Sequence, residues 1–342
     1  MAATPSLLSL LSIVPVGLLP VVTFLLLLVY LDSYRMVRVR LVVAMIVAGG
    51  AVAGLCYVLN GELMDLLGMN LVHYSRWVAP VVEESCKALV VLWLFRTHRI
   101  GFLVDSAILG FAVGTGFAVV ENFYYLYLTT NTTLVVWIVR GFGTALMHGG
   151  VVAIFAAVSQ TMSENHLRFR LVDYMPGLLI AVSVHSIFNH FFVSPVLSAV
   201  GTLLILPPML YLVFRTSERR THHWLEVDFD EDSELMQMID SGNFSQSPAG
   251  IFLTGLQQRF DGTVVVDMLC YLRVYTELAL RAKGLLLMRE NGLDVKMDAE
   301  TRDKFTELHY LEGSIGITGC LLIRPFLQMS SKDLWQLHVL GK

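Results

Sequence analysis

Residues 1–214 consist of long apolar runs separated by short polar loops. A helix needs about 20 apolar residues to span the hydrocarbon core of a bilayer. By that criterion the pattern predicts seven membrane spans, at residues 8–31, 41–59, 77–96, 103–127, 134–160, 173–193 and 196–214. The first run is too long for a cleavable signal peptide and has no basic residue before it, so we expect it to stay as a membrane helix.

The rest of the chain is more polar and carries start and stop signals for helices. Ser247 is suited to begin a helix that runs to about Phe260, and Asp261 to begin one that runs to about Asn291. Two further helices are expected, at residues 298–313 and 332–340. These signals predict a small all-α module.

Composition separates the two regions further. Apolar residues make up 55% of the chain and charged residues 15%, with a mean hydropathy of +0.65, which is untypical of a soluble globule. Residues 1–214 hold 10 of the 24 Lys and Arg and 9 of the 28 Asp and Glu, and residues 215–342 hold the other 14 and 19. We therefore predict an all-α fold in three parts: a transmembrane helix bundle of about seven spans (1–214), an acidic linker (215–246) and a cytoplasmic helical domain (247–342).

The same composition excludes some classes of partner and site. The net charge of −4 argues against nucleic acid as a partner, because nothing would neutralise a phosphate backbone. None of the four cysteines has CxxC spacing, so neither a zinc knuckle nor a disulfide framework is indicated. The lipid bilayer is the partner that the apolar runs predict, while the C-terminal domain gives no sign of what it binds.

Basic residues in the short loops predict the orientation, because cytoplasmic loops are rich in Lys and Arg. Four loops carry them: Arg35, Arg38 and Arg40; Arg96 and Arg99; Arg168 and Arg170; and Arg215, Arg219 and Arg220. With seven spans all four loops fall on one side of the membrane. We therefore expect a multi-pass protein of the cell membrane whose N-terminus is outside and whose C-terminus is cytoplasmic.

The ionisable residues inside the predicted spans include three acids, a lysine and two histidines, with an amide, Asn189, nearby: Glu83, Glu84, Lys87, Glu121, His148 and His185. A charged group near the centre of a bilayer costs about 2.5–3.5 kcal/mol on insertion scales, so these groups must face one another or a watery cavity. At about 1.5 Å per residue, those of the third, fourth and sixth spans lie roughly 9–12 Å below the external boundary. His148 lies deeper, unless the fifth helix begins near Val139.

Helical spacing predicts which of these groups face one another. Lys87 follows Glu83 by four residues and Glu84 by three, so it can pair with either acid. Gly110 and Gly114 share a stripe with Glu121, and this Gly-xxx-Gly pattern lets a neighbouring backbone approach closely.

Two side chains are candidates to hold this cluster in place. Asn189 follows His185 by four residues and can fix the imidazole or contact a substrate backbone. Arg140 is a candidate to neutralise a neighbouring acid.

Carboxylates and imidazoles in a hydrated membrane cavity suit hydrolysis. Glu121, His148 and His185 would supply the ligands of a divalent metal such as zinc, with Glu83 or Glu84 as the base that activates water. A metal-free mechanism in which a glutamate activates water stays open. The soluble metalloprotease motif HExxH and the nucleophile motif GxSxG do not occur in the sequence.

Four motifs follow in order on successive spans: EExxK at Glu83–Lys87, FxxxEN at Phe117–Asn122, then His148, and HxxxN at His185–Asn189. This series, within about residues 75–215, resembles the PrsW family of intramembrane proteases, which is related to the CAAX-processing and bacteriocin-immunity type of membrane endopeptidases. The resemblance implies a multi-helix membrane fold, hydrolysis of a membrane-associated protein, and a place in the bacterial inner membrane. Site-one cleavage of a single-span anti-sigma factor is one activity that it suggests.

The resemblance also implies catalytic roles at the matching positions, Glu83, Glu84, Lys87, Glu121, His148, His185 and Asn189. The long C-terminal region is not part of the family pattern. Two other hypotheses stay open: a non-catalytic membrane scaffold whose polar layer and helical tail assemble partner proteins, and an ion-coupled transporter, since buried acids also mark ion pathways.

Overall fold

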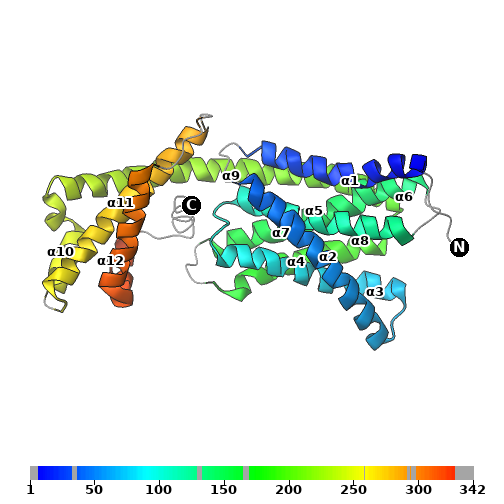
Figure 1. Ribbon diagram of the computed structural model, residues 1–342, viewed down its shortest axis with the longest axis horizontal. Helices are drawn as coiled ribbons and strands as arrows, with labels where there is room; N and C mark the ends of the chain where they lie inside the picture. Colours follow the sequence, from blue (N-terminus) through cyan, green and yellow to red (C-terminus); the bar gives the residue numbers. More distant parts are fainter. Residues whose placement is uncertain are drawn as a thin grey trace. The chain divides into compact units, whose positions relative to one another are not determined.

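The computed structural model describes residues 7–32, 37–128, 133–164, 169–257, 259–290, 293 and 298–327 (Figure 1). Every regular element among these residues is a helix. The chain divides into two compact units, which are described separately below: Met1–Ser163 with Arg168–Ser217, and Glu164–Leu167 with Glu218–Lys342.

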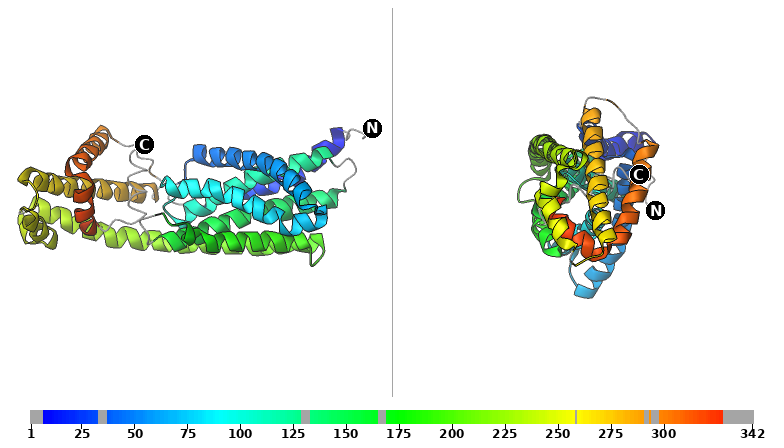
Figure 2. Two further views of the ribbon diagram at one scale, coloured as in Figure 1. Left: turned by 90° about the horizontal axis from the view of Figure 1, so that it is seen from below. Right: turned by 90° about the vertical axis from the view of Figure 1, so that its left-hand side faces the viewer.

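The apolar runs of the first unit form helices that lie roughly alongside one another (Figure 2). These elements are α1 (Leu7–Tyr30), α2 (Val39–Leu67), α3 (Leu71–Trp77), α4 (Ala79–Arg96), α5 (Leu103–Leu128), α6 (Leu134–Ile138), η1 (Val139–Ala145), α7 (Leu146–Ser163), η2 (Leu171–Tyr174), α8 (Met175–His190) and the first part of α9 (Pro195–Asp240). Each of the seven predicted runs thus corresponds to helix.

Five helical segments among the described residues are long and apolar enough to cross a membrane: Val39–Leu67, Leu103–Leu126, Leu134–Ser163, Leu171–His190 and Pro195–Thr221. The apolar part of α1 in the searched residues, Val14–Tyr30, is shorter. Helix α4 is outside this count, and it carries two acids and a lysine within 18 residues. The number of seven spans therefore stays a prediction.

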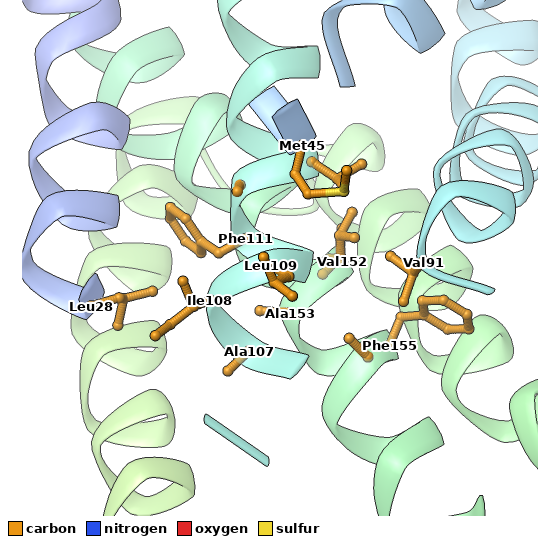
Figure 3. Close-up of a cluster of buried hydrophobic side chains, with 14 of the residues drawn as sticks. Leu28, Met45, Val91, Ala107, Ile108, Leu109, Phe111, Val152, Ala153 and Phe155 are labelled. Carbon is orange, nitrogen blue, oxygen red and sulfur yellow. The ribbon is translucent and has the colours of Figure 1, made fainter. Parts of the chain in front are cut away.

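Helix α5 packs against α1, α2, α4 and α7 of the first unit, and Figure 3 shows buried side chains from its core. Ile108 and Phe111 are fully buried on its side toward Leu28 of α1, and Phe155 of α7 packs in the same core. The Gly-xxx-Gly pattern acts as predicted, because a Cβ at Gly110 would lie 2.7 Å from the carbonyl oxygen of Val152 and one at Gly114 would overlap the carbonyl of His148. The two glycines thus bring α5 and α7 close together beside the polar cluster.

The fifth predicted span begins at Leu134 and not near Val139. Residues Val139–Ala145 form a π-helix, which contains Arg140, Gly141 and Gly143. A π-turn holds one residue more than an α-turn, so it changes which side chains face the core, and such turns are frequent at functional sites.

The second unit is a small helical module. Helix α9 continues to Asp240, so most of the segment 215–246 that was predicted as a linker is helical. Then follow η3 (Asn243–Gln246), α10 (Pro248–Leu256), α11 (Gly262–Glu290), α12 (Ala299–Ile323) and η4 (Arg324–Phe326). Ser247 and Asp298 cap α10 and α12 through their side chains. Helix α12 ends ten residues after the predicted end at residue 313, and it is kinked at Gly316, whose φ of 65° and ψ of 176° are not helical.

The core of this unit lies between α11 and α12. Met268, Leu272 and Leu278 of α11 are buried against Leu311 and Ile315 of α12. The helix predicted at 332–340 lies outside the described residues.

Candidate active site

Four helices bring the six predicted ionisable side chains into one cluster. Helix α4 supplies three of them and α5, α7 and α8 supply one each: Glu83, Glu84, Lys87, Glu121, His148 and His185. The rings of the two histidines meet edge to face, with 4.8 Å between their centroids.

Glu84 and Lys87 form the buried centre of the cluster. The Lys87 ammonium donates to Oε1 of Glu84 at 2.8 Å, and Nδ1 of His185 donates to the same oxygen at 2.7 Å. The side chains of Lys87 and Glu84 are 0% and 1% exposed. A buried charge is tolerated only with a partner and further hydrogen bonds, and each of these two groups has both.

Lys87 also sets the state of His148. Its Nζ lies 2.9 Å from Nδ1 of His148 and 3.7 Å from the centroid of the Phe117 ring, whose π face favours a cation. Since an ammonium can only donate, Nδ1 of His148 accepts and Nε2 carries the proton. Nε2 then donates to Oε2 of Glu121 at 3.1 Å.

Glu83 is held by an amide of α2. Nδ2 of Asn60 donates to Oε1 of Glu83 at 3.1 Å, and the hydroxyl of Tyr74 donates to Oδ1 of Asn60 at 3.0 Å. The other oxygen, Oε2, lies 4.0 Å from both Nζ of Lys87 and Nε2 of His185, beyond hydrogen-bonding distance. Glu83 is therefore oriented by one amide and keeps one oxygen available.

Arg140 neutralises an acid, as the sequence suggested. Its guanidinium lies 3.4 Å from Oε2 of Glu121 and stacks over the ring of Tyr125 at 3.7 Å. Its Nε donates to Oδ1 of Asn122 at 2.9 Å, and Nδ2 of Asn122 donates to the carbonyl of Gly17 at 2.8 Å. The π-helix thus brings a cation to the edge of the cluster.

Asn189 lies away from these groups. Its Nδ2 donates to the carbonyl of Ser75 at 2.9 Å, and the nearby Ser186 hydroxyl donates to the carbonyl of Arg76 at 2.7 Å. These bonds join α8 to α3. Glu84, and not Asn189, fixes the ring of His185.

A cavity of about 400 Å³ adjoins the cluster between α2, α3, α4 and α5. Two of the acids line it, Glu83 and Glu121, whose side chains are 14% and 24% exposed. Glu84 does not line it. Water and substrate in the cavity can therefore reach Glu83 and Glu121, while Glu84 is covered.

One group of side chains has the arrangement of a metal site. Ligand atoms of Glu83, His148 and His185 all lie within 4.8 Å of one another. The carboxylate differs from the Glu121 of the sequence-based set. Two imidazoles and one carboxylate are a donor set that catalytic zinc uses, so these residues fit a metal. His185 also has the outer partner that is usual for a metal-binding histidine, because its Nδ1 bonds Glu84 and leaves Nε2 for a ligand role.

A bundle of apolar helices with a carboxylate–imidazole cluster beside a cavity is typical of an intramembrane hydrolase. Residues 38–214 match the model of the PrsW family intramembrane metalloproteases, and the chain belongs to this family. It is thus a multi-pass membrane protein and an intramembrane protease, acting on membrane proteins within the bilayer. No curated protein and no solved structure matches the chain. The family favours the endopeptidase over the scaffold and transporter hypotheses.

Proposed function

We propose that the protein hydrolyses a peptide bond of a single-span membrane protein, with the bond placed between the cluster and the cavity. The observation that carries this proposal is the convergence of Glu83, His148 and His185 beside a cavity that Glu121 also lines. An unwound stretch of the substrate would enter this cavity, because a peptide bond inside an intact helix is protected by its own hydrogen bonds.

Glu83, His148 and His185 would hold the metal that the family description names. Such a metal acts as a Lewis acid on a carbonyl and on water. Glu84 keeps the His185 ring in the tautomer with a free Nε2, and Lys87 balances the charge of Glu84. His148 has partners at both nitrogens, Lys87 and Glu121, and whichever nitrogen takes the ligand role gives up its partner.

Glu121 is the candidate general base. Of the two acids that line the cavity, it is the one that this ligand set does not use, and the Arg140 guanidinium lies 3.4 Å from its Oε2. Glu121 would take one proton from water while the water oxygen bonds to the substrate carbonyl carbon. The proton would pass to the leaving nitrogen as the C–N bond breaks, giving a carboxylic acid and an amine.

An anti-sigma factor in the bacterial inner membrane is the specific substrate that the family resemblance suggests.

The proposed orientation, with the N-terminus outside, gains support from the structure. Gln160, near the end of α7, donates to the carbonyl of Gly101, just before α5. The hydroxyl of Ser217 in α9 accepts from the amide of Val104 at the start of α5. These bonds join the parts of α5, α7 and α9 that adjoin three of the four basic loops, so these parts lie at one end of the first unit. Labelling of single cysteines in these loops from either side of the membrane tests it.

The roles separate in a paired measurement of metal content and cleavage. We expect Glu83→Gln, His148→Ala and His185→Ala to lose both bound metal and cleavage of a single-span substrate in proteoliposomes. Glu121→Gln should keep the metal and lose cleavage, and chelation should stop the wild-type protein. Glu62→Gln, an exposed acid of α2 outside the cavity lining, serves as the control. Full activity in Glu83→Gln and Glu121→Gln would disprove the proposal.

A further inference from the structure

The wall that α2 contributes to the cavity is unusually open. Gly54, Tyr57, Gly61 and Met64 all line the cavity, and their spacing of three, four and three residues places them on one helical face. A Cβ built at Gly54 or Gly61 meets no atom within 4 Å. These two glycines therefore leave space that other side chains would fill, in contrast to Gly110 and Gly114, whose positions are filled by α7.

The remaining walls are mostly apolar and aromatic. Leu71 of α3 and Val120 of α5 line the cavity, and so do Tyr57 and Tyr124, whose ring centroids are 4.7 Å apart. Glu83 and Glu121 line it as well. A largely apolar space of about 400 Å³ with a few polar groups has the character of a small-molecule or side-chain pocket.

We propose that this cavity is the subsite that binds a large apolar side chain of the substrate next to the scissile bond, and that Gly54 and Gly61 set the size of side chain it accepts. The inference rests on the proposed function and names the substrate class: single-span proteins with Leu, Phe or a similar residue beside the cleavage point. Burial of such a side chain against α2 would place the adjoining peptide bond at Glu83 and Glu121.

A polypeptide fits this cavity better than the acyl chain of a lipid. Glu83 and Glu121 both line the cavity, and ionised carboxylates can accept hydrogen bonds but cannot donate them. A peptide segment brings N–H donors together with its apolar side chain. An acyl chain offers no donor, so it would cover charged oxygens at a cost in free energy.

Substitution of the glycines by leucine tests the subsite. The probe is a model single-span protein, reconstituted with the full chain, in which the residue beside the cleavage point is Ala, Leu or Phe. We expect the wild-type protein to prefer Leu or Phe over Ala by about tenfold or more in kcat/KM. Gly54→Leu or Gly61→Leu should remove or reverse this preference. Because leucine at either position enters open space, the helix should stay folded.

Gly201→Leu is the matched control. Gly201 of α9 also has no atom within 4 Å of a built Cβ, but it does not line the cavity. This variant should keep the wild-type preference. An unchanged preference in both Gly54→Leu and Gly61→Leu, or an equal loss for all three substrates, would overturn the subsite while cleavage by the wild-type protein leaves the protease function intact.

A binding measurement tests the subsite independently of catalysis. A photoreactive phenylalanine analogue at the same substrate position should cross-link to α2 in the inactive Glu121→Gln protein, and Gly54→Leu should suppress the cross-link. Cross-links to other helices alone would overturn the subsite, even with cleavage intact. No cleavage of any substrate by the wild-type protein would instead count against the proposed function.

Discussion

Glu84 fixes the ring of His185 through a hydrogen bond of 2.7 Å between Oε1 and Nδ1, and the same oxygen accepts from Lys87 at 2.8 Å. One buried carboxylate therefore determines both the tautomer of His185, a candidate ligand, and the position of the Lys87 ammonium. This arrangement separates the roles of two adjacent acids that the sequence alone could not distinguish. Glu84 orients the ring of His185, and Glu83 faces the cavity.

Glu84→Gln should weaken metal binding by about 10- to 100-fold, the usual effect of losing an outer partner of a metal-binding histidine. It should also destabilise the protein by about 3–5 kcal/mol, because it breaks a buried ion pair and leaves Lys87 with its nearest carboxylate, that of Glu83, 4.0 Å away. The double variant Glu84→Gln, Lys87→Met should recover stability but not metal affinity. Isothermal metal titration and thermal unfolding in detergent measure the two effects. Recovery of both in the double variant would show that Glu84 has no orienting role.

Arg140 should act through Glu121. Arg140→Lys keeps a positive charge but loses the bond from Nε to Asn122 and the planar stack on Tyr125, so we expect it to lower kcat about tenfold with little change in KM. Arg140→Met should cost more, since the charge is lost as well. Kinetics on one substrate with both variants check this. Equal kcat in the wild-type protein and Arg140→Met would contradict it.

The pair Asn60 and Tyr74 should position Glu83. Tyr74→Phe removes only the hydroxyl and leaves Oδ1 of Asn60 without its donor, which corresponds to about 1 kcal/mol, or roughly fivefold, in metal affinity or rate. Asn60→Leu also removes the donor to Glu83 and should have the larger effect. Metal titration of both variants shows which of them loses more metal affinity. Tyr211→Phe, at an exposed position of α9 outside the cavity lining, is the control. A larger effect from Tyr74→Phe than from Asn60→Leu would reject the chain of bonds.

The sequence could predict the helices and the convergence of the acids because both follow from large, simple energies. Apolar runs must lie in the bilayer, and Glu83, Lys87 and Glu121 could not stand alone there. The contribution of Asn60 was not predictable, because a single amide in an apolar helix forms no repeating sequence pattern that would indicate its partner. The position of Arg140 depends on a π-helix, which has no clear sequence signal, and the choice between Glu83 and Glu121 as ligand depends on side-chain distances alone.

The final prediction concerns pH and the second unit. Glu277 of α11 accepts from Lys304 of α12 at 2.6 Å and from Arg281 at 3.1 Å. Burial acts to raise the pKa of Glu277, but these hydrogen bonds and charges outweigh it, so its pKa lies below the ordinary value. A group with a lowered pKa stabilises the fold above its unfolded pKa, about 4.3 for glutamate, and this contribution is lost as pH falls through the lower folded pKa.

The contacts between α11 and α12 should therefore weaken as the pH falls below about 4.3, by at most about 1 kcal/mol for a partly exposed pair. Hydrogen exchange of α11 and α12 amides in the full-length protein, corrected for intrinsic rates, measures the change. Glu277→Gln should exchange faster than the wild-type protein at pH 7, and the difference should shrink at low pH. Glu307→Gln, at an exposed position of α12, should match the wild-type protein throughout. The opposite outcome is a difference in exchange rate between Glu277→Gln and the wild-type protein that grows on acidification. It would show that Glu277 does not hold the two helices together through its charge.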